Sequence, residues 1–299
     1  MANPFLCEQE GSMMDSHQAD SSPSTQVPIL TRAQAPVEAT FIARPNRFVA
    51  NVRLSRDVEH AYGFDRAGDE IIAHVADPGR LTELLVPGVR VYVVPAFPGE
   101  PGSCGPGRRT LYDLVLVDYD GILVSVDSRV PNDLVHLALQ EGFFPELAAY
   151  TRILRESSFG RSRLDFRLSV GECNGKGSAL RCAVEEGLPG VGDARDCFIE
   201  VKSVTLVDDG TAMFPDAPTA RGARHMKELA QAVSEGFRAV ALFVIQRIDV
   251  SSFTPNRDMD PGFSDALVGA LEAGVEVWPW RCKVSLEGIA LDASLPVRV

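Results

Sequence analysis

Short runs in which apolar and polar residues alternate fill the chain from about residue 40 to residue 127 and predict β-strands. These runs occupy residues 40–43, 47–54, 70–75, 89–95, 111–118 and 122–127. Turn sequences such as Asp77-Pro78-Gly79 and Asp120-Gly121 separate them, which is typical of a small β-barrel. A helical pattern at residues 131–141 follows and ends before Gly142, so a short helix is expected to connect the barrel to the rest of the chain.

In the second half of the chain strands alternate with helices. Strand-like runs at residues 163–170, 197–206, 238–245 and 275–279 are interleaved with helical patterns at residues 219–235 and 263–273. This alternation predicts an α/β (α+β) domain with a mixed sheet. The expected organisation is a disordered tail at 1–38, a barrel at 39–127, a helical connector at 128–150 and the α/β domain at 151–299, with a Gly-rich, acidic insertion at 171–196.

The net charge of −12, from 29 basic and 41 acidic residues, argues against a protein that coats nucleic acid with a uniformly basic surface. A local basic face remains compatible with it. The longest apolar run, residues 239–245, is far shorter than the roughly 20 residues of a membrane-spanning helix. No secretory or transit signal is evident at the N-terminus, so a cytoplasmic protein without a membrane partner is expected. The six cysteines show no zinc-like spacing.

The most informative segment is Phe198-Ile199-Glu200-Val201-Lys202-Ser203. Alternate side chains of a strand share a face, so Glu200 and Lys202 are expected on one side, with Ile199 and Val201 in the core. Asp165 lies inside a second apolar strand, where a charge is costly unless it is paired or bound to metal. If the two strands are neighbours, Asp165 and Glu200 converge as ligands for a divalent metal, with Lys202 beside them to place a water or stabilise developing charge.

The same pattern has a simpler interpretation, a cross-strand salt bridge on a half-exposed sheet, and the pattern alone favours it. Basic residues nearby support the functional interpretation. The helix predicted after Pro218 carries Arg221, Arg224 and His225, and phosphate groups prefer helix N-termini and cationic side chains. Arginines around Asp165 could complete a basic rim around an acidic centre: Arg152, Arg155, Arg161, Arg163 and Arg167. An ordinary solvated helix face is an equally good interpretation of the helix, and His225 is either a general base or a packing residue.

Several enzyme classes lose support because their motifs are missing. The segment Gly171-Glu172-Cys173-Asn174-Gly175-Lys176-Gly177 is one residue short of a phosphate-binding P-loop, and it lacks the Ser or Thr that binds magnesium. The sequence also lacks a GxGxxG after a strand, a GxSxG elbow and an HExxH helix. Nucleotide kinases, Rossmann dehydrogenases, α/β-hydrolases and zincins are therefore disfavoured.

Several collinear blocks resemble the bacterial sugar fermentation stimulation protein family, SfsA. The blocks run from about residue 40 to the C-terminus: Arg44-Pro45-Asn46-Arg47-Phe48-Val49-Ala50, 77–87, Val130-Pro131-Asn132, Arg155-Glu156, 160–166, 198–205, 214–222 with His225 and Leu229, and Ser294-Leu295-Pro296-Val297. The resemblance implies an N-terminal OB-like β-barrel followed by a mixed-sheet domain like the PD-(D/E)xK nucleases. It also implies DNA binding with little sequence preference and a regulatory link to sugar metabolism. The segment between Asp165 and Glu200 is longer than this family usually has.

Carried over residue by residue, the resemblance assigns Asp165, Glu200 and Lys202 to the nuclease-like core, and Glu156 to the acid that precedes it. Mg²⁺ or Mn²⁺ would then be held by Asp165 and Glu200. The residues expected to contact DNA are Arg44, Arg47 and Arg80 on the barrel and Arg163, Arg221, Arg224 and His225 around the acidic centre. A homodimer is left open.

Three functional hypotheses follow. The first is a DNA-binding regulator whose nuclease-like domain is a scaffold, and the second is a Mg²⁺- or Mn²⁺-dependent nuclease that cleaves phosphodiesters at Asp165, Glu200 and Lys202. The third is a protein-interaction module that uses the acidic surface and the N-terminal tail. DNA binding is the favoured role, with cleavage as the alternative.

Overall fold

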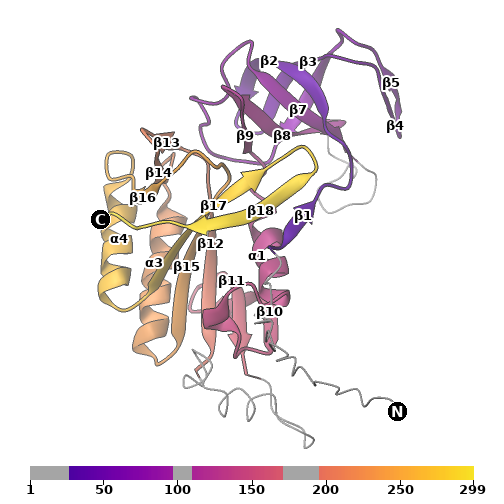
Figure 1. Cartoon of the computed structure of the whole chain (residues 1–299). Coiled ribbons are helices and arrows are strands. Elements are labelled where there is room, and N and C mark those ends of the chain that lie inside the picture. The colour runs from indigo at the N-terminus through magenta and orange to yellow at the C-terminus, as the bar shows by residue number, and fades with distance from the viewer. Residues whose placement is uncertain (1–26, 97–109, 171–194) are drawn as a thin grey trace, which may run out of the picture.

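The computed structural model describes residues 27–96, 110–170 and 195–299. Within them a β-barrel lies against the end of a larger α/β domain (Figure 1). The order of a barrel followed by a domain with a mixed sheet agrees with the predicted fold class. Three expectations concern residues outside those described: the disorder of residues 1–26, the loop at 97–109, and nearly all of the insertion at 171–196.

The barrel forms because apolar side chains at alternate strand positions point to one interior. Its strands are β2 (Val37–Asn46), β3 (Val49–Leu54), β6 (Glu70–Val75), β7 (Arg90–Pro95), β8 (Tyr112–Tyr119) and β9 (Ile122–Ser125), beside a small hairpin of β4 (Val58–His60) and β5 (Gly63–Asp65). The order is β6-β3-β2-β7-β8-β9, and parallel pairing of β6 with β8 closes the barrel. In β3, for example, Ala50, Val52 and Leu54 are buried while Arg53 faces solvent.

The α/β domain is built on a seven-stranded sheet of order β1-β18-β17-β15-β12-β11-β10. These strands are β1 (Ile29–Thr31), β10 (Arg152–Phe159), β11 (Ser162–Ser169), β12 (Cys197–Val204), β15 (Arg238–Ile245), β17 (Glu276–Val284) and β18 (Gly288–Ser294). The three central strands, β12, β15 and β17, run parallel. Seven of the eight residues of β15 are buried, as expected for a central strand that is covered on both faces.

Helices cover the two faces of this sheet unequally. One face packs on α3 (Ala220–Ser234) and α4 (Pro261–Glu272), and the other on α1 (Val130–Gln140) and the short helix η1 (Pro145–Leu147). A small sheet of β13 (Val207–Asp208), β14 (Thr211–Phe214) and β16 (Ser252–Pro255) lies beside α4. The separate apolar clusters on the two faces therefore fix which side chains of β12 point toward α3.

Within the described residues, eight strands lie outside the runs expected from the sequence: β1, β4, β5, β10, β13, β14, β16 and β18. Two of them, β1 and β10, form the edges of the seven-stranded sheet. Residues 29–31 lie in the segment expected to be a disordered tail, yet they form β1, which pairs with β18, and residue 37 already begins β2. The polar strand β10 is also absent from the expected elements. Both are edge strands. The partner of β1 is β18, at the other end of the chain, and β10 is mostly exposed, so the local apolar pattern carries little sign of either strand.

The barrel is joined to the α/β domain at the carboxyl ends of β12 and β15. The amide of Ser125 donates to the carbonyl of Gln246 (3.1 Å), and the amide side chain of Gln246 donates to the carbonyl of Asp127 (3.4 Å) and to Ser203 Oγ at the end of β12 (2.9 Å). The buried guanidinium of Arg247 lies 4.8 Å from the ring centroid of Tyr119 in β8. These contacts hold the barrel beside the sheet edge at which ligands of α/β proteins usually bind.

Candidate functional site

Strand β12 places Glu200 and Lys202 on the face that packs against α3. Phe198 and Val204, on the same face, belong to the apolar cluster under α3, whereas Ile199 and Val201 pack under α1. The structure therefore has Glu200 and Lys202 on one face of β12 and Ile199 and Val201 on the other, as expected from the sequence. Glu200 is only 3% exposed, so its charge has to be balanced by neighbouring groups rather than by solvent.

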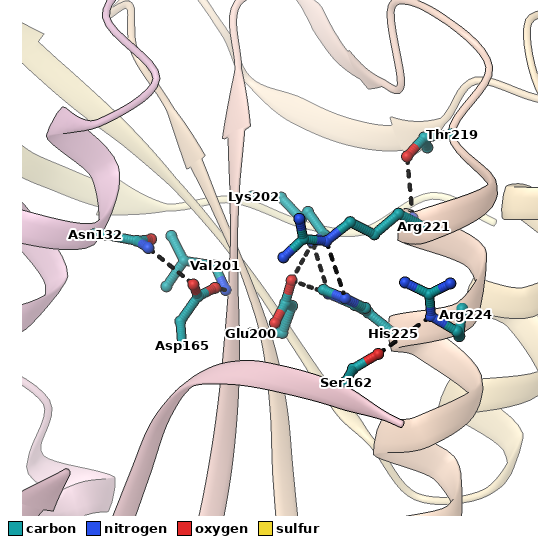
Figure 2. Close-up of polar contacts among 11 residues, drawn as sticks. Asn132, Ser162, Asp165, Glu200, Val201, Lys202, Thr219, Arg221, Arg224 and His225 are labelled. Atoms are coloured by element: carbon teal, nitrogen blue, oxygen red, sulfur yellow. Dashed lines mark hydrogen bonds and ion pairs between the residues drawn. The ribbon is translucent and has the colours of Figure 1, made fainter. Parts of the chain in front are cut away.

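Two side chains contact the carboxylate of Glu200, and a third, Arg221, is linked to them through His225 (Figure 2). The ammonium of Lys202 and Nδ1–H of His225 both donate to Glu200 Oε1. Nε2 of His225 accepts a hydrogen bond from Nε of Arg221 (3.4 Å), which fits the neutral imidazole with its proton on Nδ1. Glu200 Oε2 is buried and has no protein partner. The cluster thus presents one unsatisfied carboxylate oxygen.

Electrostatics keep Glu200 ionised despite its burial. Burial raises the pKa of this carboxyl group, but the positive charge of Lys202 and the hydrogen bonds from His225 and Lys202 lower it further than burial raises it. The pKa of Glu200 is therefore below its ordinary value. A permanently ionised carboxylate with a free oxygen is suited to a cation.

Asp165 lies on β11 beside this cluster but is held by other partners. Its Oδ1 accepts a hydrogen bond from Asn132 of α1 (2.8 Å), and its Oδ2 accepts one from the backbone amide of Val201 (2.7 Å). Burial raises the pKa of Asp165 to about 6, and the charge of Glu200 adds to the effect. Figure 2 shows Asp165 turned toward Asn132 while Glu200 is turned toward His225. The two carboxylates are electrostatically coupled neighbours, each with its own set of partners.

An interruption of the strand ladder explains the position of Asp165. The pairing of β11 with β12 is given by Phe166↔Ile199 and the two pairs beyond it, and does not include Asp165. On the other side, the pairing of β10 with β11 skips Glu156 and Asp165, and Glu156 has a φ of 55°, unusual for a non-glycine residue. The carboxylate of Asp165 therefore takes the place of a main-chain acceptor for the amide of Val201.

A pocket of about 390 Å³ opens beside the Glu200 cluster. It is lined by Ser158, Gly160, Arg161, Ser162, Arg163, Arg221, Arg224 and His225. None of these lining residues is acidic. Nε of Arg224 donates to Ser162 Oγ (3.1 Å), so this guanidinium is anchored to the β10–β11 hairpin. Four arginines around a polar pocket supply the positive charge and the hydrogen-bond donors that an anion would need.

The structure does not bring all predicted site residues together. Arg163, Arg221, Arg224 and His225 line the pocket, whereas the exposed Glu156 pairs with Arg163 (3.6 Å) and has no described contact with Asp165 or Glu200. The guanidinium of Arg44 is turned inward and donates to four backbone carbonyls, those of Arg47, Asp77, Gly79 and Arg80. Arg47 and Arg80 are exposed on turns of the barrel, away from the pocket lining.

Sequence reasoning gives no role to Asn132 and Ser162, which position Asp165 and Arg224. It also places Arg161 only in a general rim of arginines, although this residue lines the pocket and its amide donates to Glu228 (3.3 Å). Asn132 and Ser162 do each fall within one of the family-like blocks, Val130-Pro131-Asn132 and 160–166. A role for Ser162 cannot be found from spacing, because its partner is 62 residues away in the chain.

The donor set around Glu200 is compatible with a hard divalent cation, although it is sparse. Among residues 27–96, 110–170 and 195–299 no group of three His, Cys, Asp or Glu side chains is placed to hold a metal ion. Mg²⁺, however, commonly binds through one or two carboxylates and keeps several waters. The unpartnered Oε2 of Glu200 provides one carboxylate of that kind, and Asp165, whose two oxygens accept from Asn132 and Val201, lies beside it.

Comparisons with known proteins connect both domains to one family. Residues 42–126 match the family described as SfsA N-terminal OB domain, and residues 129–288 match the sugar fermentation stimulation protein RE domain. A sugar fermentation stimulation protein homolog of Desulforamulus reducens is 41% identical over 263 residues, which cover 88% of this chain and 92% of that protein. A homolog of Moorella thermoacetica is also 41% identical, over 88% of this chain and 97% of that protein.

A solved structure is similar over nearly the whole chain. It is described as SfsA of Pyrococcus furiosus in complex with Ca²⁺, and it matches with a TM-score of 0.71 at 27% identity, covering 90% of this chain and 98% of that one. The expected OB-like barrel followed by a mixed-sheet domain is thereby confirmed. None of the helices in the described part of the chain has the length and apolar character needed to span a membrane.

Proposed function

This chain belongs to the sugar fermentation stimulation protein family, and we propose that it binds DNA with little sequence preference through phosphate contacts in the arginine-lined pocket. The observation that carries the proposal is the pocket itself, where Arg161, Arg163, Arg221 and Arg224 surround a polar space without any acidic lining residue. Contacts to phosphate position a protein on DNA but carry no sequence information. Low sequence preference follows from that chemistry.

The pocket also makes the proposed DNA binding compatible with a net charge of −12. Affinity for DNA depends on the cations that replace counterions at the phosphates, and these can be concentrated locally. Four arginines at one site, two from the β10–β11 hairpin and two from the first turns of α3, provide such a local concentration. Binding of this kind is steeply weakened by salt.

The test is fluorescence anisotropy with labelled DNA of two unrelated sequences, each as a duplex and as a single strand, at about 50 to 200 mM salt. Arg161→Ala and Arg224→Ala are each expected to weaken binding to both sequences equally and to reduce the salt slope by about one. Arg66→Ala is the matched control, because Arg66 is an exposed arginine next to β5, at the far end of the barrel (Figure 1).

Equal effects of Arg66→Ala and Arg224→Ala would refute the pocket as the binding site. Wild-type protein that shows no salt-sensitive binding to any of the four DNA molecules would refute DNA binding altogether. Strong discrimination between the two sequences would refute low sequence preference.

A second candidate function, metal-dependent cleavage of phosphodiesters, is favoured by the unpartnered Oε2 of Glu200 next to the arginine pocket. Asp165 and Glu200 would hold Mg²⁺ or Mn²⁺, in keeping with the Pyrococcus furiosus relative, whose solved structure is a complex with Ca²⁺. The bound cation would supply charge stabilisation at the scissile phosphate. From this chain, Lys202 would add a positive charge beside that phosphate, and Arg221 and Arg224 would orient it.

The cleavage hypothesis is tested with supercoiled, linear and single-stranded DNA in the presence of Mg²⁺ or Mn²⁺. Glu200→Gln keeps the shape of the side chain but removes its charge, and Lys202→Met removes the ammonium. Both variants are expected to abolish cleavage, and Glu200→Gln is also expected to weaken Mn²⁺ binding measured by calorimetry at least about tenfold. Circular dichroism verifies that each variant is folded. If the wild type binds DNA but cleaves it under none of these conditions, the cleavage hypothesis is wrong and only the proposed DNA binding stands.

The family name also links these proteins to sugar fermentation, and we include a regulatory role in sugar metabolism in the proposal. In the source organism, deletion of the gene is expected to change transcripts of sugar-utilisation genes. The Arg224→Ala protein should fail to restore them. Restoration by Arg224→Ala to the wild-type level would separate such a role from DNA binding at the pocket.

A further inference from the structure

An aromatic ring is exposed on the outer surface of the barrel at the turn between β2 and β3. Phe48 is 51% exposed, and its ring stacks on the imidazole of His74 in β6, with centroids 6.5 Å apart and planes inclined by 19°. Ile72, two residues before His74 on the same face of β6, is 52% exposed. A stacked ring with an open second face on an OB-like barrel is the arrangement that can accept a nucleobase.

The backbone of Phe48 is fixed although its ring is exposed. Its amide donates to Asn46 Oδ1 (2.9 Å). Its carbonyl accepts from the amide of Val75 (3.0 Å) and lies 3.1 Å from Nδ1 of His74. A fixed backbone leaves only the side-chain torsions of Phe48 to be restricted when a ligand binds, which lowers the entropic cost of binding.

Two exposed arginines lie on the Phe48 turn and on the turn bonded to it. Arg47 precedes Phe48 and is exposed, and Arg80 is exposed on the turn formed by residues 77–80. The guanidinium of Arg44 joins the two turns, because it donates to the carbonyls of Arg47 (2.6 Å) and Gly79 (2.8 Å). Arg47 and Arg80 therefore lie on two turns joined through one internal side chain.

The turn at residues 77–80 is hydrogen-bonded to the segment that leads into α3. The amide of Arg80 donates to Asp216 Oδ2 (2.8 Å), and Asp216 lies three residues before Thr219, the N-cap of α3. Arg221 and Arg224, which line the arginine pocket, lie in the first turns of that helix. A continuous set of hydrogen-bonded contacts thus connects the Phe48 turn to the pocket.

We propose that Phe48, backed by His74, stacks a base of single-stranded DNA whose phosphates contact Arg47 and Arg80, and that the strand continues from there to the arginine pocket. This inference rests on the proposed DNA binding and names the form of DNA. Single-stranded DNA is favoured because its bases can present a free face to the ring, whereas the bases of a duplex are stacked on one another. The adjacent arginines complement a phosphate backbone, not an apolar surface alone.

The experiment compares the affinities of the full chain for three labelled DNA molecules: a single-stranded dT oligomer of about 20 nucleotides, the same length of abasic backbone, and a duplex. Phe48→Ala is expected to weaken binding to the dT oligomer at least about fivefold and to leave binding to the abasic strand unchanged, because only the stacking contribution is lost. Phe48→Trp should keep the affinity, and its added fluorescence should be quenched when the dT oligomer binds. Phe64→Ala is the matched control, since Phe64 is 56% exposed on the β4–β5 hairpin.

An equal loss of affinity for the abasic strand, or equal effects of Phe48→Ala and Phe64→Ala, would overturn the stacking site. If Arg224→Ala weakens binding and Phe48→Ala does not, the stacking site is wrong while the proposed DNA binding stands. If the wild type binds none of the three molecules, both are wrong. Quenching of Phe48→Trp by the dT oligomer but not by the abasic strand would support base stacking directly.

Discussion

At the scale of single residues, neighbours decide whether a buried carboxylate keeps its charge. Glu200 is buried against Lys202 and His225, and its pKa is lowered. Asp165 is largely buried too, but it accepts from neutral donors and lies next to another carboxylate, and its pKa is raised to about 6. Asp77, at the junction of the two domains, also has its pKa raised to about 6, mainly by burial. Three carboxyl groups removed from solvent thus have different electrostatic properties.

Asp77 provides a prediction about pH. Its pKa in the folded chain, about 6, is above the ordinary value of 3.8, so the folded state binds more protons between these values than the unfolded state does. The contribution of Asp77 to stability is therefore most favourable below about pH 4 and is lost as the pH rises through about 6. Asp77→Asn keeps an acceptor for the amide of Gly79 and is expected to raise the free energy of unfolding near pH 7.5 by roughly 1–3 kcal/mol.

Urea unfolding of the wild type and of Asp77→Asn at about pH 7.5 and about pH 4 measures this effect. The gain in the free energy of unfolding from Asp77→Asn should be largely lost at the lower pH. The carboxyl group of Asp77 is then protonated in the folded chain and about half protonated in the unfolded chain. A lower stability of Asp77→Asn at the higher pH would show that the carboxylate is stabilising, contrary to the prediction.

At the scale of elements, α3 organises the candidate site because its first turns carry Arg221, Arg224 and His225. The helix begins where Thr219 caps it: the Thr219 side chain accepts a hydrogen bond from the amide of Gly222 (3.0 Å), and the backbone amide of Thr219 donates to Asp260 (2.7 Å). Asp260 in turn caps α4. One carboxylate therefore fixes the starts of both helices on this face of the sheet.

Thr219→Ala is expected to lower the free energy of unfolding by about 1 kcal/mol, because the amide of Gly222 loses its acceptor. Thr219→Ser retains the hydroxyl and should lose less than half of that. The measurement is urea unfolding, with DNA affinity determined on the same samples. If the alanine and serine variants lose equal stability, the methyl group rather than the cap is responsible.

At the scale of the whole molecule, the two domains are joined by contacts that also connect the two surfaces proposed to contact DNA. The turn at residues 77–80 meets Asp216, and the carboxyl ends of β12 and β15 meet the end of the barrel. Gly79 is required at this junction. A Cβ at this position would lie 2.1 Å from Asp216 Oδ2, which is closer than any real contact.

Gly79→Ala should displace the carboxylate of Asp216 and break its hydrogen bond with Arg80, with a loss of roughly 1–3 kcal/mol of stability. In an Asp216→Ala background the same substitution should cost less, with the contact to Asp77 Oδ1 (2.8 Å) remaining, and a double-mutant cycle of urea unfolding measures the difference. Gly269→Ala in α4 is the control, because a Cβ there meets nothing within 4 Å. Equal costs of Gly79→Ala in both backgrounds would exclude Asp216 as the cause.

The amino-acid sequence alone is enough to establish the fold class, most strands and helices, and the sidedness of Glu200 and Lys202, because these follow from the local alternation of apolar and polar residues. Its collinear blocks also identify the family. The sequence alone cannot distinguish the role of Arg44 from that of Arg47 three residues away. The guanidinium of Arg44 donates to backbone carbonyls, whereas Arg47 is exposed. The sequence also cannot show β1 as a strand, because the hydrogen bonds of β1 come from β18, which begins at residue 288.

The partners of each charged group, in contrast, are settled by the tertiary structure. The pocket draws its lining from the β10–β11 hairpin and from α3, with Ser162 and Arg224 62 residues apart in the chain, so no spacing rule could assemble it. The pKa values of Asp165 and Glu200 diverge because one is held by Asn132 and a backbone amide and the other by Lys202 and His225. Hydrophobic periodicity is a local property that the sequence carries, whereas electrostatic environment depends on which distant groups the folded chain brings together.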